Sequence, residues 1–425
     1  MGHQPCQGRF ARLKSAEADP DHGAPPAVYR DTNLQILFCV TLVAVMSVSS
    51  ITPALPGIAQ VLGVSAQQVA LLITAFTLPG VFLTPLLGVL ADRWGRKPVL
   101  APSLFLFALA GTACAFCRDF PLLLALRFGQ GIGAAALGAL NVTIIGDLYS
   151  GRRRAAAMGY NASVLNVGTA SYPAIGGALA TLAWYAPFFL PLLAVPVGLL
   201  VVFRLHNPEP RNHEDLGLYL RTAWASIRRR EVVGLFVVGV ATFILLYGAY
   251  LSYFPFLLRN RFGASPLLIG AMMSTMSLTT AITASQMGRL TKRFSERTLI
   301  RAAFVLYAIA LPLIPLMPTI WLLPLPILVF GVGQGINMPS VQTLLASLAP
   351  IEHRAAFMSI NGTVLRLGQT LGPLVMGVVF ALWGASWPFY AGAILSLLMV
   401  GLLAVTIRQL PAHQPAQTPG VPPAA

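Results

Sequence analysis

The sequence predicts an all-α integral membrane protein of twelve transmembrane helices in two six-helix repeats. Hydrophobic residues make up 56% of the 425 residues and charged residues only 10%, whereas soluble chains carry about 25% charged residues. The chain also offers roughly a dozen apolar stretches of about 20 residues, the length that crosses a hydrocarbon core of about 30 Å. A third observation is a similarity between the two halves of the chain at a fixed offset.

Apolar length and polar breaks give the predicted spans in order. They are 34–56, 67–90, 98–117, 121–148, 155–182, 185–204, 233–258, 267–288, 298–317, 321–349, 355–382 and 386–407. Residues 205–232 form the only long polar interruption and divide the spans six and six. The predicted organisation is a tail (1–33), a bundle (34–204), a linker (205–232) with a surface helix at 218–227, a second bundle (233–407) and a Pro-rich tail (408–425).

Basic residues predict the orientation of the spans. Of the 28 basic residues, Arg127 and Arg366 lie inside spans, and only Arg118, Arg259 and Arg261 fall in loops on one side. The others lie on the opposite side, together with both termini. Because cytoplasmic loops carry an excess of Lys and Arg, we expect a multi-pass protein of a bacterial inner (plasma) membrane, with both termini cytoplasmic. The polar first 33 residues contain no cleavable signal pattern.

The net charge of +15 does not indicate nucleic-acid binding, because the cations form short loop clusters and no continuous face. The Cys114-x-x-Cys117 pair has no His nearby, so a zinc site is not expected and both cysteines are interpreted as packing residues. No metal or cofactor is expected. The lipid bilayer and a small-molecule substrate are the expected partners, and a monomer is expected.

The second half repeats the first at an offset of 200 residues. Chance identity in Gly- and Ala-rich sequence is an alternative, but the Arg, Asn and Pro matches at one offset are harder to explain by chance. Such repeats build alternating-access transporters whose substrate site lies near the midplane. The sharpest matches pair Arg154, Asn161, Gly168, Pro173 and Gly177 with Arg354, Asn361, Gly368, Pro373 and Gly377.

A charged motif lies between the second and third predicted spans. Its glycines permit a tight turn after a helix, and its carboxylate beside three cations can dock on a neighbouring helix end. An ordinary basic loop would explain the cations but not the carboxylate and the glycines. The motif contains Gly88, Asp92, Arg93, Gly95, Arg96 and Lys97.

This motif resembles the loop motif that marks the major facilitator superfamily at every key position. The resemblance implies the major facilitator fold and a conformational latch. In such a latch, Asp92 caps the eleventh helix near Arg354, where free amides and the helix dipole favour an anion, and Arg96 bridges Asp92 to Asp147. The equivalent loop of the second half lacks the Asp and the second Gly, so we expect an asymmetric latch.

Further motifs resemble those of the twelve-span drug:proton antiporter branch. Arg127-Phe-Gly-Gln130-Gly131 in the fourth span is similar to a second family motif, and Gly168 and Pro173 lie in a motif of the fifth. Tyr172 stands where that motif has Gly, although the eleventh span keeps the Gly-Pro pair. Small residues and Pro kinks suit either a moving seam or static packing. The expected hinge and packing residues are Gly168, Pro173, Gly177, Gly368, Gly372 and Pro373.

Two arginines are the only ionisable side chains expected deep in the core. Intramembrane charges are costly and usually functional. Arg127 could extend outward to water, and Arg366 could bond carbonyls or amides of neighbouring helices. The polar residues that could line a cavity, or instead join neighbouring helices, are Gln130, Asn141, Asn161, Asn166, Gln286, Gln334, Asn337, Gln342, Asn361 and Gln369. Tyr247, Tyr250 and Tyr253 are expected to form a stripe on one helix face.

The expected function is export of drug-like or metabolite-like solutes by a secondary transporter, with H⁺ as the coupling ion that the resemblance implies. The carboxylates all lie in loops or at span ends, Asp147 included, which argues against exchange of cations for protons. Arg366 is therefore expected to contact a neutral or anionic substrate. The residues expected to serve substrate or coupling are Arg127, Gln130, Asn141, Asn337, Asn361 and Arg366. An importer or facilitator is an alternative, and a receptor or intramembrane enzyme is another, although no catalytic constellation is visible.

Overall fold

The computed structural model describes residues 28–206, 230–348 and 354–406, and these residues form helices without any β-strand. The predicted surface helix at 218–227, residues 1–27 of the predicted N-terminal tail and the predicted C-terminal tail (408–425) lie outside the described residues. The all-α prediction is thus confirmed over the part of the chain that the structure describes.

The first half of the chain forms six helical spans joined by short loops. Their elements are η1 (Val28–Arg30), α1 (Thr32–Ile51), η2 (Thr52–Ala54), α2 (Leu55–Leu62), α3 (Ala66–Trp94), α4 (Arg96–Phe116), α5 (Phe120–Leu148), α6 (Gly151–Leu182), η3 (Ala186–Leu193) and α7 (Ala194–Arg204).

The second half repeats this plan. Its elements are α9 (Arg230–Phe243), η4 (Ile244–Tyr253), α10 (Phe254–Phe262), α11 (Pro266–Ser285), α12 (Met287–Leu290), α13 (Glu296–Leu316), η5 (Ile320–Leu322), α14 (Pro324–Leu348), α15 (Arg354–Trp383) and α16 (Trp387–Thr406).

Local chemistry explains several helix boundaries. Ser65 forms a capping box with Gln68, in which each side chain accepts a hydrogen bond from the other residue's backbone N–H. Asp119 caps α5 through the N–H of Leu122 at 2.9 Å. Gly95 has φ 97°, a conformation that suits glycine, and it separates α3 from α4 without any longer loop.

Several spans differ from the straight helices that the sequence predicts, and the sixth and tenth begin with the 3₁₀ segments η3 and η5. The first continues through a 3₁₀ turn at Thr52–Ala54, which contains Pro53, and ends at Leu62 instead of residue 56. The seventh changes to a π-helix over Ile244–Tyr253. The eighth ends at Ser285, and α12 follows after Gln286. Hydrophobic length predicts a span but not the local winding within it.

Eleven helices among the described residues are long and apolar enough to cross a membrane. The remaining span, α6, is 32 residues long but is less apolar, since it begins with three arginines and carries polar residues such as Asn161 and Asn166. It packs against α1 and α11 within the bundle. Its polarity therefore reflects its position between other helices.

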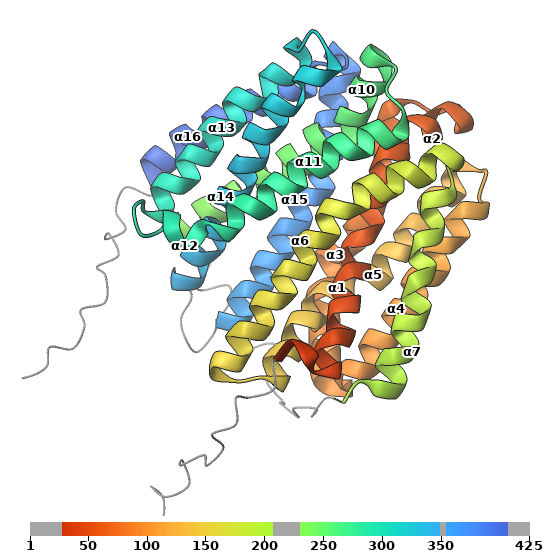
Figure 1. The fold of residues 1–425 in the computed structure, drawn as a ribbon, viewed down its shortest axis with the longest axis vertical. Helices are drawn as coiled ribbons and strands as arrows, with labels where there is room; N and C mark the ends of the chain where they lie inside the picture. The colour runs from red at the N-terminus through yellow and green to blue at the C-terminus, as the bar shows by residue number, and fades with distance from the viewer. Residues whose placement is uncertain (1–27, 207–229, 349–353, 407–425) are drawn as a thin grey trace, which may run out of the picture.

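Figure 1 shows the helices of the first half beside those of the second, and each half has its own apolar core. One cluster of buried side chains runs from Leu34 to Leu205 and includes Phe256 from the second half. The other runs from Val232 to Leu403 and includes Ala70 from the first half. Phe256 and Ala70 thus join the two cores.

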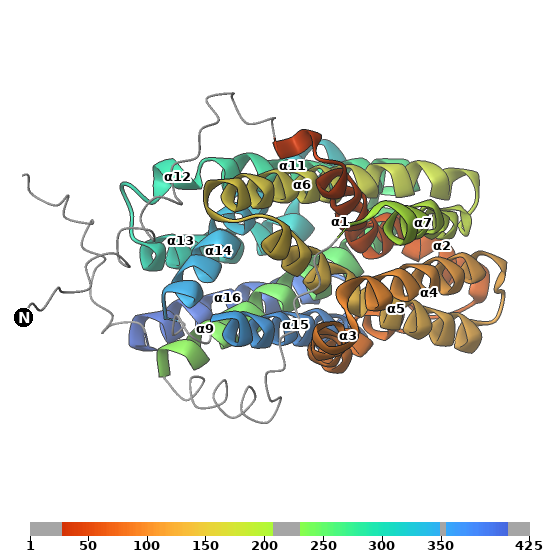
Figure 2. The same cartoon turned by 90° about the horizontal axis from the view of Figure 1, so that it is seen from below.

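The two halves meet along two pairs of helices on opposite sides of the molecule. Figure 2 shows α6 beside α11 and α3 beside α15, and these pairs make the most extensive contacts between halves. Within the halves, α6 packs on α1 while α15 packs on α9 and η4. Equivalent spans thus have equivalent neighbours, as the offset of 200 predicts.

The two ends of the molecule differ in how tightly the halves meet. We call the end where α1 starts and α16 ends the terminal face, and the end with α2 and α10 the distal face. The distal part of α3, from Val69 to Gly80, is mostly buried, whereas residues 81–94 are mostly half-buried or exposed. Contacts between α2 and α10 also join the halves distally. The distal side is therefore the closed side.

Candidate substrate site between the two halves

The seam between α6 and α11 depends on small residues and one hydrogen bond. The backbone N–H of Ala174, which follows the helix-breaking Pro173, donates to the hydroxyl of Ser274 on α11 at 3.1 Å. A Cβ on Gly177 would meet the carbonyl oxygen of Pro266, and one on Gly270 would meet that of Pro173. The two backbones are therefore as close as glycine allows.

The seam between α3 and α15 is built from threonines. The hydroxyl of Thr74 donates to the carbonyl oxygen of Thr370 at 3.3 Å, and the hydroxyl of Thr370 donates to that of Thr77 at 3.0 Å. Gly80, one turn further along α3, faces the side chain of Arg366 one turn from Thr370 on α15. Thr74, Thr77 and Gly80 recur every three residues, so they share one helix face.

Arg366 lies at the terminal edge of this threonine seam. Its side chain is half-buried, and a Cβ on Gly80 would be 3.2 Å from its Cδ and Nε atoms. Its Nη1 donates to the Oε1 of Gln369 at 3.2 Å. A guanidinium has five N–H donors, so most of its hydrogen-bonding capacity is left for another partner.

Arg127 is placed differently and is fully buried. Its Nε donates to the carbonyl oxygen of Leu72 at 3.2 Å, and its Nη1 donates to Ser47 Oγ at 2.6 Å and to Gln130 Oε1 at 2.7 Å. Its guanidinium carbon lies 4.5 Å from the ring centroid of Phe76. The alternative that Arg127 extends outward to water is thus wrong, because three helices supply its partners in the core.

Carboxylates do not neutralise these two cations within the part of the chain that the structure describes. The described carboxylates are at helix caps or in terminal turns of helices. Arg127 instead has three neutral acceptors and an aromatic face. Arg127 Nη2 has no hydrogen-bond partner among the described residues, but Arg366, with one amide partner, makes fewer hydrogen bonds and is the less compensated charge of the core.

Two predicted cavity residues join helices of the first half. Asn141 on α5 donates through Nδ2 to the hydroxyl of Thr41 on α1 at 2.5 Å, and Thr41 donates to Asn161 Oδ1 on α6 at 2.6 Å. All three side chains are buried. Asn141 and Asn161 therefore act as interhelical bonds in this conformation.

The second half contains a comparable polar cluster with different residues. Asn337 on α14 donates to Thr242 on α9 at 2.7 Å, and the hydroxyl of Tyr307 on α13 donates to Gln334 Oε1 at 2.7 Å. Asn361 is 4% exposed. Of the other predicted cavity residues, the accessible ones are Asn166, Gln286, Gln342 and Gln369.

The charged motif forms a compact ion-pair cluster on the terminal face. Arg96 is 8% exposed, and it pairs with Asp92 at 3.0 Å and with Asp147 on α5. Arg93 is exposed, and a Cβ on Gly88 would have no neighbour within 4 Å. The expected contact of Asp92 with the start of α15 near Arg354 stays a prediction, because the residues that lead into this helix, 349–353, lie outside the described residues.

The three tyrosines of the seventh span do not share one face. Tyr250 stacks on Phe330 with ring centroids 5.4 Å apart, and Tyr253 stacks on Phe380 at 4.9 Å, both inside the second half. Tyr247 instead packs against the core of the first half. The expected single stripe is wrong because these residues lie in the π-helix η4, where each residue turns by a smaller angle than in an α-helix.

The expected hinge glycines all lie at close helix contacts. A Cβ on Gly168 would be 3.0 Å from side-chain atoms of Leu42 and Val45 on α1, and one on Gly368 would be 2.8 Å from the carbonyl oxygen of Val240 on α9. A Cβ on Gly372 would be 2.8 Å from the backbone nitrogen of Gly248. Close packing is therefore present at each of them.

Sequence reasoning missed the residues that contact Arg366 and close the seams. Gly80, Thr77, Thr370 and Ser274 are small residues without any motif around them. Thr77 and Thr370 are 293 positions apart, so no local spacing connects them. The signal available in the sequence was the presence of small hydroxyl residues on both the second and the eleventh spans, which could have indicated that these two spans bond to each other.

Comparisons with known proteins agree with this architecture. The family model of the Major Facilitator Superfamily matches residues 37–270 and 248–424. The chain is 25% identical to multidrug resistance protein 1 of Bacillus subtilis, over 92% of this chain and 99% of the relative. It is 25% identical to the class B tetracycline resistance protein of Escherichia coli (90% and 98%) and to the bacillibactin exporter of Bacillus subtilis (88% and 96%).

Solved structures share the fold at lower sequence identity. The nucleoside transporter NupG superposes with a TM-score of 0.76 at 14% identity, covering 89% of this chain and 100% of that one. The human organic anion transporter MFSD10 gives a TM-score of 0.67 at 23% identity, covering 88% and 99%. These likenesses concern the arrangement of the helices.

Proposed function

Because this chain belongs to the major facilitator superfamily of membrane transporters, we propose that it exports drug-like or metabolite-like small molecules by alternating access. The observation that carries this proposal is the incompletely compensated Arg366 at the edge of a seam between two six-helix halves. While the distal part of the seam is closed, a substrate can reach Arg366 only from the terminal face. Sliding of α3 and α6 against α15 and α11 would transfer access to the other side.

The terminal face is proposed to be cytoplasmic. Within the described residues, Arg118, Arg259 and Arg261 are the basic residues of distal loops and helix ends, while all other basic residues outside the core lie toward the terminal face. The positive-inside rule then places both termini in the cytoplasm of a bacterial inner membrane. The closed distal seams would make this an inward-facing conformation.

Reporter fusions test this orientation directly. Alkaline phosphatase fused after Arg118 or Gly263 should be active, because it would be exported, whereas fusions after Lys97 or Arg293 should be inactive. Fluorescent-protein fusions at the same sites should give the reverse pattern. The same reporter activity at distal and terminal sites would contradict both the orientation and the proposed direction of transport.

Export is supported by the relatives, whereas the preference for neutral or anionic substrates is supported by the lack of carboxylates near Arg366 among the described residues. Two of the relatives are named as resistance proteins and one as an exporter. An unpaired guanidinium costs several kcal/mol inside a membrane on mild insertion scales, and an anionic or strongly polar substrate would lower that cost. We therefore propose neutral or anionic substrates, a proton as the coupling ion and a monomeric transporter.

A susceptibility and metabolite screen that compares a null strain with its complemented partner would identify substrates. Export predicts that the null strain accumulates the compound and that everted vesicles take it up when a proton gradient is applied. Uptake into whole cells in place of efflux would favour the alternative of an importer or facilitator. Accumulation that does not respond to collapse of the proton gradient would contradict proton coupling.

Substitution of Arg366 tests the substrate contact. Arg366→Lys keeps a positive charge but loses the planar fork, so we expect reduced transport with altered selectivity. Arg366→Ala should lose transport at normal membrane levels. Arg152→Ala, which removes a guanidinium from the exposed start of α6, is a matched control. Full activity of Arg366→Ala, or strong efflux of permanent cations by the wild type, would overturn this part of the proposal.

A further inference from the structure

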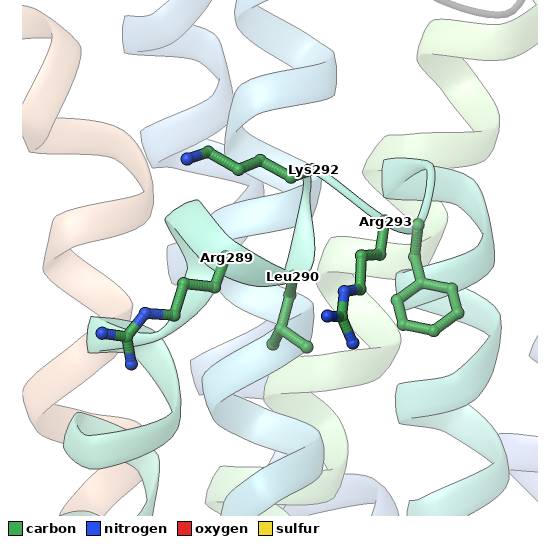
Figure 3. A pocket seen from close by; sticks show the side chains of 5 residues that line it. Arg289, Leu290, Lys292 and Arg293 are labelled. Atoms are coloured by element: carbon green, nitrogen blue, oxygen red, sulfur yellow. The ribbon is translucent and has the colours of Figure 1, made fainter.

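A hollow on the terminal face lies between the end of α11 and the start of α13. It encloses about 420 Å³ and is lined by Arg289, Leu290, Lys292, Arg293 and Phe294, which we call the basic corner. In Figure 3, Arg293 extends beside Leu290, while Arg289 and Lys292 extend away from them. All three cations and Phe294 are exposed, so the corner is open to an external partner.

The basic corner is the repeat counterpart of the ion-pair cluster in the first half. There, Arg96 is held between the carboxylates of Asp92 and Asp147. At the offset of 200, Lys292 replaces Asp92 and Ser347 replaces Asp147. Each turn therefore has one carboxylate, Asp92 in the first half and Glu296 at the position of Arg96 in the second, but the second turn has four cations where the first has three.

The cations of the basic corner are not neutralised by the described part of the protein. Arg289 donates to the neutral Gln286 at 2.8 Å, and no ion pair joins Arg289, Lys292 or Arg293 to a described carboxylate. Glu296 is the nearest carboxylate in sequence, and it lies in the first turn of α13, where its charge is favourable to the helix dipole. Three adjacent cations that repel one another are stabilised by an external anion.

We propose that the basic corner binds the headgroup of an anionic phospholipid. The corner lies where two membrane-crossing helices end, which is the level of lipid phosphates. Its cations match a phosphate, while Leu290 and Phe294 offer apolar surface for the adjoining glycerol and acyl chains. Basic pockets between transmembrane helices on the cytoplasmic side are suited to such headgroups.

The position of the corner gives a bound lipid a route to influence transport. The corner follows directly on α11, whose distal part forms the seam with α6 through Ser274. A headgroup held between α12 and the start of α13 would restrain the terminal end of α11. This inference concerns a different surface from the substrate site, so it can fail while the proposed function stands.

Native mass spectrometry of the full-length protein tests the proposal. Purified protein in detergent would be titrated with dioleoyl-phosphatidylglycerol, and separately with the zwitterionic phosphatidylcholine. The combined substitution of Arg289→Gln, Lys292→Gln and Arg293→Gln should weaken retention of the first phosphatidylglycerol at least fivefold. Retention of phosphatidylcholine should be weak and unchanged.

A matched variant controls for nonspecific surface charge. Arg152→Gln, Arg153→Gln and Arg154→Gln remove the same charge from an exposed run at the start of α6 and should change phosphatidylglycerol retention less than twofold. Equal losses in both triple variants would overturn the proposal. Complete competition by glycerol 3-phosphate would also overturn it, by indicating a site for soluble anions.

A single substitution serves if the triple variant does not fold. Lys292→Asp places a carboxylate where the first half has one, and it should weaken phosphatidylglycerol retention by a similar factor in a protein that remains monodisperse on size exclusion. Unchanged retention in monodisperse Lys292→Asp would contradict the proposal.

Discussion

Gly80→Ala perturbs the neighbour of Arg366 without removing any polar group. An alanine methyl at this position would lie 3.2 Å from Cδ and Nε of Arg366, whereas carbon atoms prefer separations of about 3.5–4.0 Å. The side chain of Arg366 is flexible and half-buried, so it can move away by a few tenths of an ångström. The guanidinium would then shift relative to Gln369 and to any substrate bound beside it.

Stability and transport should respond in opposite directions. Alanine favours a helix over glycine by about 1 kcal/mol, so the thermal midpoint of Gly80→Ala should be equal to or above that of the wild type. A charge-assisted hydrogen bond contributes about 1.5–3 kcal/mol, and loss of about half of it corresponds to a three- to tenfold rise in KM for an anionic substrate. Transport of a neutral substrate should change less than twofold.

Everted vesicles with one anionic and one neutral substrate from the screen would measure this difference. Gly362→Ala is the matched control, because Gly362 lies on α15 one turn from Arg366 and a Cβ there meets nothing within 4 Å. Equal losses for both substrates would mean that the methyl obstructs the seam between α3 and α15. Unchanged KM for both substrates would refute the proposed role of Arg366.

Two further predictions concern the other charged clusters. Asp92→Asn removes the carboxylate that pairs with Arg96, so transport should fall severalfold at normal membrane levels. The control Asp119→Asn, on the distal face, should transport normally. Wild-type transport rates in Asp92→Asn would show that the latch role is wrong. The lysine in Arg127→Lys cannot bond to Leu72, Ser47 and Gln130 at the same time. The free energy of unfolding of this variant in detergent should therefore fall by about 1–3 kcal/mol. Ser47→Ala, which removes one of these partners, should lower it by about 1 kcal/mol. An unchanged thermal midpoint for Arg127→Lys would contradict this account of the buried cluster.

Most of the fold follows from hydrophobic length and the internal repeat. The boundaries of α5 (Phe120–Leu148) and α13 (Glu296–Leu316) lie within two residues of the predicted spans, because charged or polar residues mark where each apolar stretch ends. The π-helix over Ile244–Tyr253 was not predictable in this way. Its winding fits the close contact between Gly248 and Gly372, and the two residues lie in distant parts of the sequence.

The candidate site was less predictable than the fold, because its partners are distributed over four helices. Charge and depth alone identify Arg127 and Arg366 as unusual. They do not show that Arg127 is surrounded by Ser47, Leu72 and Gln130. Nor do they show that Gly80 leaves the space occupied by Arg366, since a glycine in an apolar helix gives no chemical signal of its own.

The contrast between the two arginines explains why one is the better candidate for contact with substrate. Arg127 is fully buried and already donates three hydrogen bonds through Nε and Nη1, so it would have to lose bonds or become exposed before it could bind a ligand. Arg366 has one amide partner and is packed across the seam against Gly80. Separation of α3 from α15 would remove that packing and change the position of the guanidinium. The affinity of Arg366 for an anion would therefore differ between the two conformations. A ligand can shift a conformational equilibrium only through such a difference in affinity.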